Sequence, residues 1–583
     1  MRSAAARAVL LTMALAAAPA AASPVGPEAG GDQVQISPGA VVRPESGAVL
    51  STAPVIAAIV IERRNVFDPA VKGEDWWPFR IADEIRFVTR EKVVRDELLF
   101  APGDRWDALK VIQSERNLRS SYPFRQAEIV SVPRSDGRVD THVLTQDSWS
   151  TNPRIGFGTS GGQSNASLGL EENNLLGYGK SVSYVHSQGN GTIGPQHSDS
   201  YSYGDPRFLG TRLALGGAYT RTQDGDSESV TLSRPFYALD TSRAVSLAWS
   251  NGNGVGALVQ NGADYSNYYE RRRVVDAATG WRLPEDRWFV QRVEVGWYED
   301  HADFGTSNES PGTRPGLLPL NRNISGPTIA YSWIQPRYVK ETYIDRMERV
   351  EDFNLGNELR VRSGYMAQAA GSAQDEWIFN ASDRQGLGLG EGRFALAAAS
   401  ISGRVLENRW ENGLAAANAS FFWKNYFRTR SRTLVAHVEA AQAHRLDLEN
   451  QLVLGGSTGL RGYKNDSFTG GRSILANLED RFFFDGEYFH LARFGGALFV
   501  ETGSVVPEGD NFSTARFHSD VGAGMRVAGT RSGAGTVVRM DLAYALNGGP
   551  GGSRWVFSLK AGQSFSFFNS ASQRVITSPA SQL

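Results

Sequence analysis

The chain has 583 residues and no cysteine, and its 60 lysines and arginines against 62 aspartates and glutamates give a net charge of -2. The lack of cysteine excludes a disulfide framework, a thiolate zinc site and a cysteine nucleophile, and the near-neutral balance indicates no nucleic-acid partner. A single compact core stops growing at about 250–300 residues, so the length requires several domains or a barrel. Glycine is abundant at 63 residues while proline is ordinary at 24, which favours ordered, glycine-rich segments over a disordered chain.

The first residues predict export. Residues 1–23 combine a basic start, an apolar run from Ala8 to Ala18 and a small-residue cleavage region, as in a secretory signal peptide. That run and every later apolar stretch are too short for a membrane-spanning helix, which needs about 20 residues. Residues 24–53 have no period and many glycines and prolines, so we expect a flexible linker.

Residues 54–150 predict a small α+β domain. The strand-like AAIVIERRNVF is followed by two segments with apolar residues at helical spacing, TREKVVRDELLF and DRWDALKVIQSERNLRS. Two alternating segments, QAEIVSV and RVDTHVLTQD, then flank a turn at 135–137, as in a hairpin. The expected order is β-α-α-β-β.

From residue 151 to residue 568 the helical period disappears, and period-2 segments such as RLALGGAYTRT, RAVSLAWSN and VVRMDLAYAL follow one another. Short breakers such as NLLGYG alternate with longer polar loops at 301–325 and 337–349. Short turns at one end and long loops at the other indicate a mainly β protein, a transmembrane antiparallel β-barrel, which must close because lipid cannot satisfy an open edge.

The alternating segments predict between sixteen and twenty strands. A large soluble β-sandwich or a propeller is the alternative to a barrel. A propeller would show a repeat of about 40–50 residues, and the sequence has none.

The last strand carries a pattern of its own. In LKAGQSFSF, Lys560, Gly562, Phe565 and Phe567 follow the polar-x-Gly-x-x-aromatic-x-aromatic order, which resembles the insertion signal of bacterial outer-membrane barrels. That signal usually ends the chain, whereas a tail of residues 569–583 follows here. An ordinary edge strand with two exposed phenylalanines is the alternative.

Residues 454–466, LGGSTGLRGYKND, allow two incompatible interpretations. GGSTG fits the G-x-S-x-G spacing of a hydrolase nucleophile elbow, with Ser457 as the nucleophile. An elbow needs a strand that leads into a sharp turn and a helix, and no helical period follows. The overlapping GLRGY instead indicates a loop that holds Arg461 in one place, since a guanidinium group can engage carboxylates bidentately.

In this order, LGGSTGLRGY, ILANLEDRFFF and GGALFVETGSV resemble the BamA/TamA outer-membrane superfamily, also called the bacterial surface antigen family. EENNLLGYGK is similar to an early barrel hairpin of that family. The helical segments before residue 121 are similar to its polypeptide-transport-associated (POTRA) domain. The resemblance covers nearly all of the chain from Val55 to Phe568, and it implies a single POTRA-like domain followed by sixteen barrel strands.

The resemblance also implies roles for individual residues. Arg461, Gly462 and Tyr463 would form the tip of a loop folded back into the barrel, and Gly462 would permit a tight tip. Arg461 would pair with Glu479 and with Glu501, which stands where the family usually has aspartate. The pairing would serve either the stability of the fold alone or the mechanism directly.

The implied function is insertion or translocation of unfolded polypeptides by a barrel in the bacterial outer membrane. The POTRA-like domain would lie in the periplasm, where a soluble partner could bind it. A client strand would add at a weak seam between the first strand, about 154–160, and the last, about 554–568, because glycine-rich strands pack poorly. We expect no cofactor and no enzymatic step. A single POTRA-like domain favours a dedicated or accessory role.

Two alternatives stay open. A passive channel or a structural barrel of the surface would show stable ion conductance and would leave other proteins unaffected. An enzyme is the other alternative, and the acidic residues Asp224, Asp226 and Glu228 are then the candidates for metal binding. The same residues are equally typical of a solvated loop or an adventitious calcium site.

Overall fold

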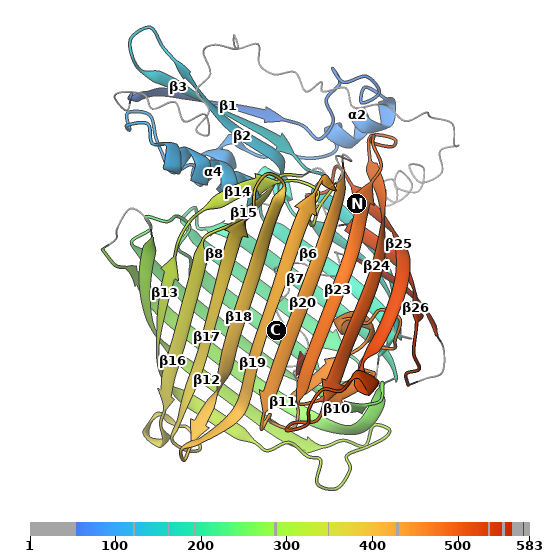
Figure 1. Cartoon of the computed structure of the whole chain (residues 1–583). Helices are drawn as coiled ribbons and strands as arrows, with labels where there is room; N and C mark the ends of the chain where they lie inside the picture. The colour runs from blue at the N-terminus through green and yellow to red at the C-terminus, as the bar shows by residue number, and fades with distance from the viewer. Residues whose placement is uncertain are drawn as a thin grey trace.

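The computed structural model describes residues 54–561 together with 575–576, apart from 121–122, 161–162, 192–193, 285–288, 348, 427–430, 534–536 and 551–553. A closed antiparallel barrel makes up most of the described chain, and a small α+β domain stands on one of its ends (Figure 1). The expected signal peptide and the expected linker lie outside the described residues.

The barrel contains twenty strands in the described part of the chain. Its strands are β4 (Thr151–Ser160), β5 (Gln163–Glu172), β6 (Ser181–Gly191), β7 (Gly194–Phe208), β8 (Leu213–Thr222), β9 (Asp226–Arg234), β10 (Arg243–Gln260), β11 (Ala263–Arg282), β12 (Val290–Thr306), β13 (Arg322–Ile334), β16 (Asn357–Met366), β17 (Glu376–Gly388), β18 (Arg393–Leu406), β19 (Arg409–Lys424), β20 (Arg432–His444), β23 (Arg472–Phe483), β24 (Ala492–Val506), β25 (His518–Gly529), β26 (Val537–Ala545) and β27 (Trp555–Ala561).

The count is the upper limit of the range expected from the alternating segments, and the sixteen strands implied by the family resemblance are wrong. The chain reverses at turns as short as residues 223–225 and 261–262. Such short turns add strands while they hardly interrupt the alternating pattern. The number of strands therefore follows from the turns and is not specified by the motifs that carry the resemblance.

The alternation places opposite chemistry on the two faces of the barrel. On β23, Asn477, Glu479 and Arg481 are buried inside, while Leu478 between them is 45% exposed on the outside. Exposed apolar side chains stand on the outer face of many strands, for example Leu170, Val245, Trp297, Ile329, Trp377, Leu498 and Leu542. A polar interior and an apolar outer face are typical of a barrel surrounded by lipid.

The connections fall at two ends of the barrel. The end that faces the N-terminal domain is called the domain end, and it carries the turns at 173–180, 209–212 and 235–242. The opposite end, called the far end, carries the loops at 307–321, 445–471 and 507–517. The long segment 335–356 lies at the domain end and not with the other long loops, which corrects the expectation from the sequence. Strand direction decides the end, and β13 runs toward the N-terminal domain.

The N-terminal domain packs helices against a three-stranded sheet. The sheet order is β1-β3-β2, with β1 parallel to β3, and the elements are β1 (Ile56–Arg64), α2 (Trp77–Glu84), α3 (Glu91–Glu97), α4 (Ala108–Ser120), β2 (Phe124–Pro133) and β3 (Val139–Asp147). Val94 of α3 and Leu118 of α4 are fully buried against Val143 of β3. None of the described helices is long and apolar enough to cross a membrane.

The expected β-α-α-β-β order is present with one addition. Helix α2 is missing from the expectation because its eight residues include only three buried positions, Pro78, Phe79 and Ala82. A segment of two turns is too short to establish a helical period in the sequence.

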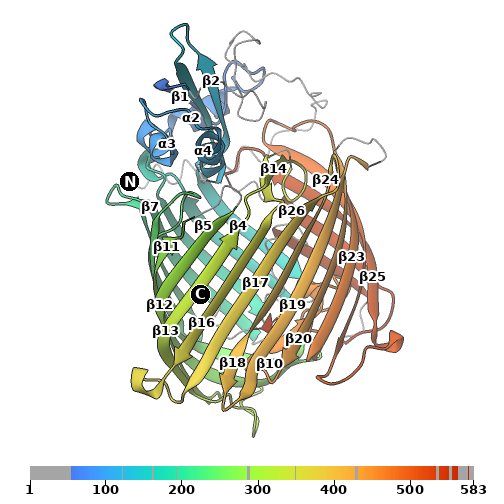
Figure 2. The ribbon, with the colours of Figure 1, turned by 60° about the vertical axis from the view of Figure 1, so that its left-hand side comes forward.

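The N-terminal domain stands over the domain end of the barrel (Figure 2). Ion pairs join it to several turns there. The pairs are Glu97 with Arg207 at 2.5 Å, Glu74 with Arg531 at 2.6 Å, Glu115 with Lys340 at 2.7 Å and Arg119 with Asp352 at 2.7 Å. Glu74, Glu115 and Arg531 are buried, and most of the other partners are half-buried. Buried pairs are directional, so the domain is held in one orientation on the barrel.

The barrel closes between β27 and β4. The described residues of these two strands share one paired position, Leu559 with Thr159, whereas β26 and β27 pair continuously from Val538 to Tyr544. The last strand is described as far as Ala561, and Lys560 of the expected insertion signal lies in it. Gly562, Phe565 and Phe567 of that signal lie outside the described residues.

The C-terminal tail is described at Val575–Ile576, which forms β28. These residues pair with Leu452 and Gln451 of β21 (Gln451–Leu454). Strand β21 belongs to the loop between β20 and β23 and not to the wall of the barrel. The tail therefore adds a strand to a small sheet formed by that loop.

Candidate functional site

The loop between β20 and β23, residues 445–471, turns back into the barrel and is called the lumenal loop. It contains β21, a 3₁₀ turn (Gly456–Thr458) and β22 (Phe468–Gly470). It is tied to several strands of the wall by Asp447 with Arg404 of β18 at 2.6 Å, Glu449 with Arg322 of β13 at 2.5 Å, and Asn465 with Gln163 of β5 at 2.7 Å. These strands are far apart around the barrel, so the loop spans the lumen.

The glycines of GGSTG serve the backbone geometry of this loop. Gly456 has φ 55°, and a Cβ there would lie 2.1 Å from Oδ1 of Asn465. That oxygen accepts a hydrogen bond from the backbone N–H of Ser457 at 2.8 Å. The side chain of Ser457 is exposed, and the element after the turn is strand β22. The strand-turn-helix context of a nucleophile elbow is therefore missing at Ser457.

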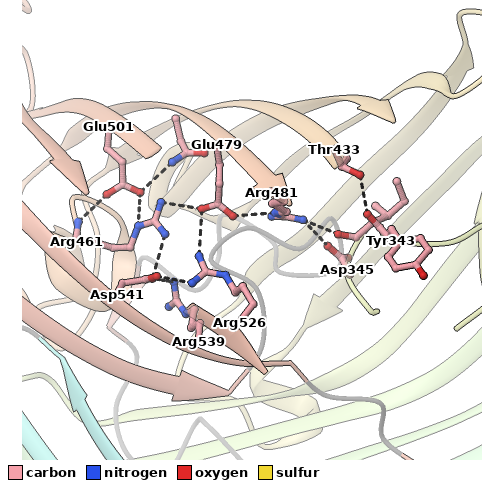
Figure 3. A network of polar contacts seen from close by, with 12 residues as sticks. Tyr343, Asp345, Thr433, Arg461, Glu479, Arg481, Glu501, Arg526, Arg539 and Asp541 are labelled. Atoms are coloured by element: carbon pink, nitrogen blue, oxygen red, sulfur yellow. Dashed lines mark hydrogen bonds and ion pairs between the residues drawn. The ribbon is translucent and has the colours of Figure 1, made fainter. Parts of the chain in front are cut away.

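Arg461 is 3% exposed, and its guanidinium group reaches three carboxylates (Figure 3). Its Nε donates to Glu501 at 2.9 Å, its Nη2 pairs with Glu479 at 2.9 Å, and its Nη1 pairs with Asp541 at 3.1 Å. The structure thus brings Arg461 together with both carboxylates expected from the sequence and with a third, Asp541, that was not expected.

Glu501 holds the loop tip at two atoms. One of its oxygens accepts the backbone N–H of Arg461 at 2.7 Å, and the other accepts Nε of the same residue at 2.9 Å. Asn477 also donates to Glu501, at 3.0 Å. Glu501 therefore contacts both the backbone and the side chain of the loop tip.

Gly462 and Tyr463 place the rest of the tip. Gly462 is absent from the residues with positive φ, so glycine is not needed there for a left-handed backbone. A Cβ at Gly462 would lie 2.6 Å from Cβ of Asp520, so glycine is needed for close approach to the wall. The hydroxyl group of Tyr463 bonds to the carbonyl oxygen of Ser519 at 3.0 Å and to the side chain of Asn547 at 2.8 Å.

Three further arginines from the wall complete the site. Arg481 donates to Glu479 at 2.8 Å, Arg526 pairs with Asp541 and lies 3.7 Å from Glu479, and Arg539 lies 3.4 Å from Asp541. The arginine cluster is defined as Arg461, Glu479, Arg481, Glu501, Asp520, Arg526, Arg539 and Asp541. Its arginines lie among carboxylates that face them, as burial of charge requires.

The sequence contains a signal for these residues that the motifs alone did not reveal. Successive inward positions on a strand are two residues apart. Once Glu479 is assigned to the lumen, Asn477 and Arg481 must face it as well. The pair Arg539 and Asp541 has the same spacing on β26, but its position beside Glu479 depends on the order of strands in the closed barrel.

An aromatic ring covers the guanidinium group. The carbon at the centre of that group lies 3.3 Å from the ring centre of Phe499, an arrangement that favours a cation. A Cβ at Gly522 of the next strand would lie 2.3 Å from this ring. Glycine on the inner face of β25 therefore makes room for the ring that covers Arg461.

A second insert enters the lumen from the domain end. Residues 335–356, called the lumenal hairpin, contain β14 (Tyr338–Glu341) paired with β15 (Glu351–Asn354). Ile344 and Phe353 of this hairpin are buried with Phe394 and Phe422 of the wall. The side chain of Glu351 accepts the backbone N–H of Ile344 and of Asp345, at 3.3 Å and 3.1 Å. The hairpin is thus packed and hydrogen-bonded inside the barrel.

Arg481 joins the two inserts. Its Nη1 donates to the carbonyl oxygen of Ile344 at 2.6 Å, and its Nε donates to Glu479, which pairs with Arg461. At the other end of the hairpin, Asp352 pairs with Arg119 of α4. A continuous series of polar contacts therefore leads from the N-terminal domain to the tip of the lumenal loop.

The acidic residues considered for metal binding do not form a site of their own. Asp226 accepts a hydrogen bond from Asn253 at 2.8 Å, and Glu228 one from Asn251 at 3.3 Å. Within the described ranges, the acidic and histidine side chains that converge are Glu74, Glu487 and His490. Arg531 pairs with both of these glutamates, at 2.6 Å and 3.0 Å, so their charge is already compensated.

No protein-family model matches the chain, and no curated protein matches it. Solved structures similar to it include CdiB from Acinetobacter baumannii, at 12% identity and a TM-score of 0.46 over 88% of this chain and 74% of that one. CdiB from Escherichia coli has 9% identity and a TM-score of 0.45 over 88% and 76%.

BamA from Haemophilus ducreyi lacking POTRA domains 1–3 has 12% identity and a TM-score of 0.35 over 88% of this chain and 84% of that one. All three scores are low, so the function has to be inferred from the residues of this chain.

Replacement of Arg461 by alanine is expected to destabilise the barrel by about 3–5 kcal/mol, because it leaves buried carboxylates without their counter-ion. Arg461→Lys keeps the charge and loses the fork geometry, so we expect an intermediate loss. The midpoint temperature of the heat-induced shift of the folded barrel on gels measures both effects. Ser457→Ala, on the same loop but exposed, is the matched control and should leave the midpoint unchanged. An Arg461→Ala variant with the same midpoint temperature as the control would show that Arg461 does not stabilise the barrel.

Removal of Arg481 is expected to loosen the lumenal hairpin. Ile344 is fully buried, so a cysteine at 344 in this cysteine-free chain should react slowly with a maleimide. Loss of a hydrogen bond to a charged group costs about 1.5–3 kcal/mol. Arg481→Ala should therefore raise the rate of the maleimide reaction at position 344 about ten-fold or more. The control Arg432→Ala removes an outward ion pair with Asp480 on the neighbouring strand. Equal maleimide reaction rates in the two variants would show that Arg481 does not hold the lumenal hairpin in place.

Proposed function

We propose that this chain is an outer-membrane barrel of the BamA/TamA type that inserts or translocates unfolded polypeptides. The arginine cluster, in which Arg461 at the tip of the lumenal loop pairs with Glu479 and Glu501 of the wall, is the observation that carries the proposal. The order of motifs from the lumenal loop to β24 supports it. The apolar outer face and polar inner face of the barrel support its place in a membrane.

The seam supplies a place for strand addition. Opening of the seam would free backbone N–H and C=O groups, which would bond an incoming client strand by the same ladder that joins the other strands. Gly156 and Gly158 on β4 weaken packing against a neighbour. A seam weakened in this way would open sideways at a lower energetic cost.

The N-terminal domain would receive the client on the periplasmic side. Strands β1 and β2 form the two edges of its sheet, and an edge strand can pair with an extended peptide. The ion pairs at the domain end hold this sheet directly beside the barrel. The lumenal loop and the lumenal hairpin would keep the wall beside the seam rigid while the seam opens.

A passive channel is the second candidate function. A barrel of sixteen or more strands is wide enough for an aqueous channel, but here the lumenal loop and the lumenal hairpin both occupy the lumen. Tight packing of Ile344 and Phe353 against the wall does not favour wide, permanent conduction. A surface structural role is compatible with the fold but gives the weak seam no purpose.

Depletion of the protein in its host is expected to remove a defined set of outer-membrane barrels or one secreted protein, because their insertion or export would fail. Quantitative proteomics of the outer membrane and of the secreted fraction measures this loss and identifies the clients. An unchanged proteome, together with stable ion conductance of the purified protein in liposomes, would instead establish a channel.

A disulfide across the seam is expected to block the handling of those clients. Thr159 and Leu559 are partners in the sheet, so cysteines at both positions have the spacing that a disulfide needs. Complementation of depleted cells by the double variant should fail until a reductant is added.

The matched control is a cysteine pair at Val521 and Tyr544, partners in the fully paired β25–β26 ladder. That disulfide should leave client handling intact. Normal complementation by the oxidised seam variant would show that the seam does not open during function.

A further inference from the structure

Five large apolar side chains are exposed near one side of the domain end. Trp76, Trp77 and Ile85, in and beside α2, are 45%, 54% and 60% exposed, and Phe484 and Phe489 of the β23–β24 turn are 50% and 53% exposed. These five residues are called the aromatic rim. Exposed apolar surface of this extent is typical of an interaction site.

Helix α2 is fixed on the β23–β24 turn by its other face (Figure 1). Its buried residues Phe79 and Ala82 pack with Leu491 of that turn. The ring centre of Phe79 lies 6.4 Å from that of His490. The rim therefore moves with the barrel, although it combines residues from two parts of the chain.

The β23–β24 turn also continues the outer face of the barrel. The ring centres of Phe484 and Phe482 are 5.9 Å apart at the end of β23, and those of Tyr488 and Phe494 are 5.2 Å apart at the start of β24. Further along β24, Leu498 faces outward and is 52% exposed. Apolar surface thus extends from the outer face of the strands to the turn that carries α2.

We propose that the aromatic rim lies in the headgroup layer of the bilayer around the barrel, so that α2 anchors the N-terminal domain to the lipid surface. The proposal rests on the membrane location within the proposed function. Tryptophan and other amphipathic rings concentrate at this layer. Lys72 and Arg80 are exposed beside the rim together with Asp75 and Glu84, and the two basic side chains can meet lipid phosphates.

Continuity with the outer face favours lipid over a protein partner. A surface built for a soluble client or for a second copy has no need to join the apolar face of β23 and β24. An amphipathic helix with one face on protein and the other carrying tryptophan and arginine is instead suited to an interface. The anchor would add to the ion pairs that orient the N-terminal domain.

The lack of cysteine allows single-site labels in the full chain. Trp77→Cys and Phe489→Cys would each carry an environment-sensitive fluorophore, with the protein in vesicles of phosphatidylethanolamine and phosphatidylglycerol. Lipids brominated near the headgroup would be the quencher. Leu498→Cys is the lipid-facing reference, and Leu109→Cys on α4, 71% exposed, is the control outside the rim.

The expected result is quenching at positions 77 and 489 at least half as large as at 498, with none at 109. Quenching at position 498 alone would overturn the proposal that α2 is an anchor, while the membrane location of the barrel would stand. Loss of quenching at 498 as well would overturn the membrane location itself. Shielding of position 77 from aqueous iodide without quenching by lipid would show that a protein covers the rim, and would also overturn the proposal.

Discussion

A buried arginine that binds several carboxylates at once is the interaction on which the interior of this barrel depends. A charge removed from water is tolerated only where opposite charges and hydrogen bonds replace the lost solvent. Arg461 meets that condition with Glu479, Glu501 and Asp541, which come from three different strands. The pairing therefore holds the lumenal loop against the wall and joins those strands to one another.

The second insert extends this network toward the N-terminal domain. Arg481 bonds to the loop side through Glu479 and to the lumenal hairpin through Ile344. The hairpin in turn is bonded to α4 through Asp352. Two inserts that enter from opposite ends are thus parts of one polar structure, and a shift of the N-terminal domain has a physical route to the loop tip.

The arginine cluster lies close to the closure of the barrel. Strands β23 to β26 are joined by long ladders on the backbone and by the arginine cluster on the inside. One strand further on, β27 meets β4 and closes the barrel. The proposed seam would therefore lie beside a wall that the arginine cluster holds together.

Local patterns in the sequence by themselves determined the barrel class and the helices and hairpin of the N-terminal domain, while the pairing of Arg461 with Glu479 and Glu501 was implied by the resemblance of the motifs. Period-2 alternation and short motifs are properties of neighbouring residues, so they survive without a structure. Only the tertiary structure decided the twenty strands, the end at which residues 335–356 fold inward, and the places of Arg526 and Asp541 beside Glu479. Those features depend on strand direction and on closure of the sheet, which bring together residues that no local pattern connects.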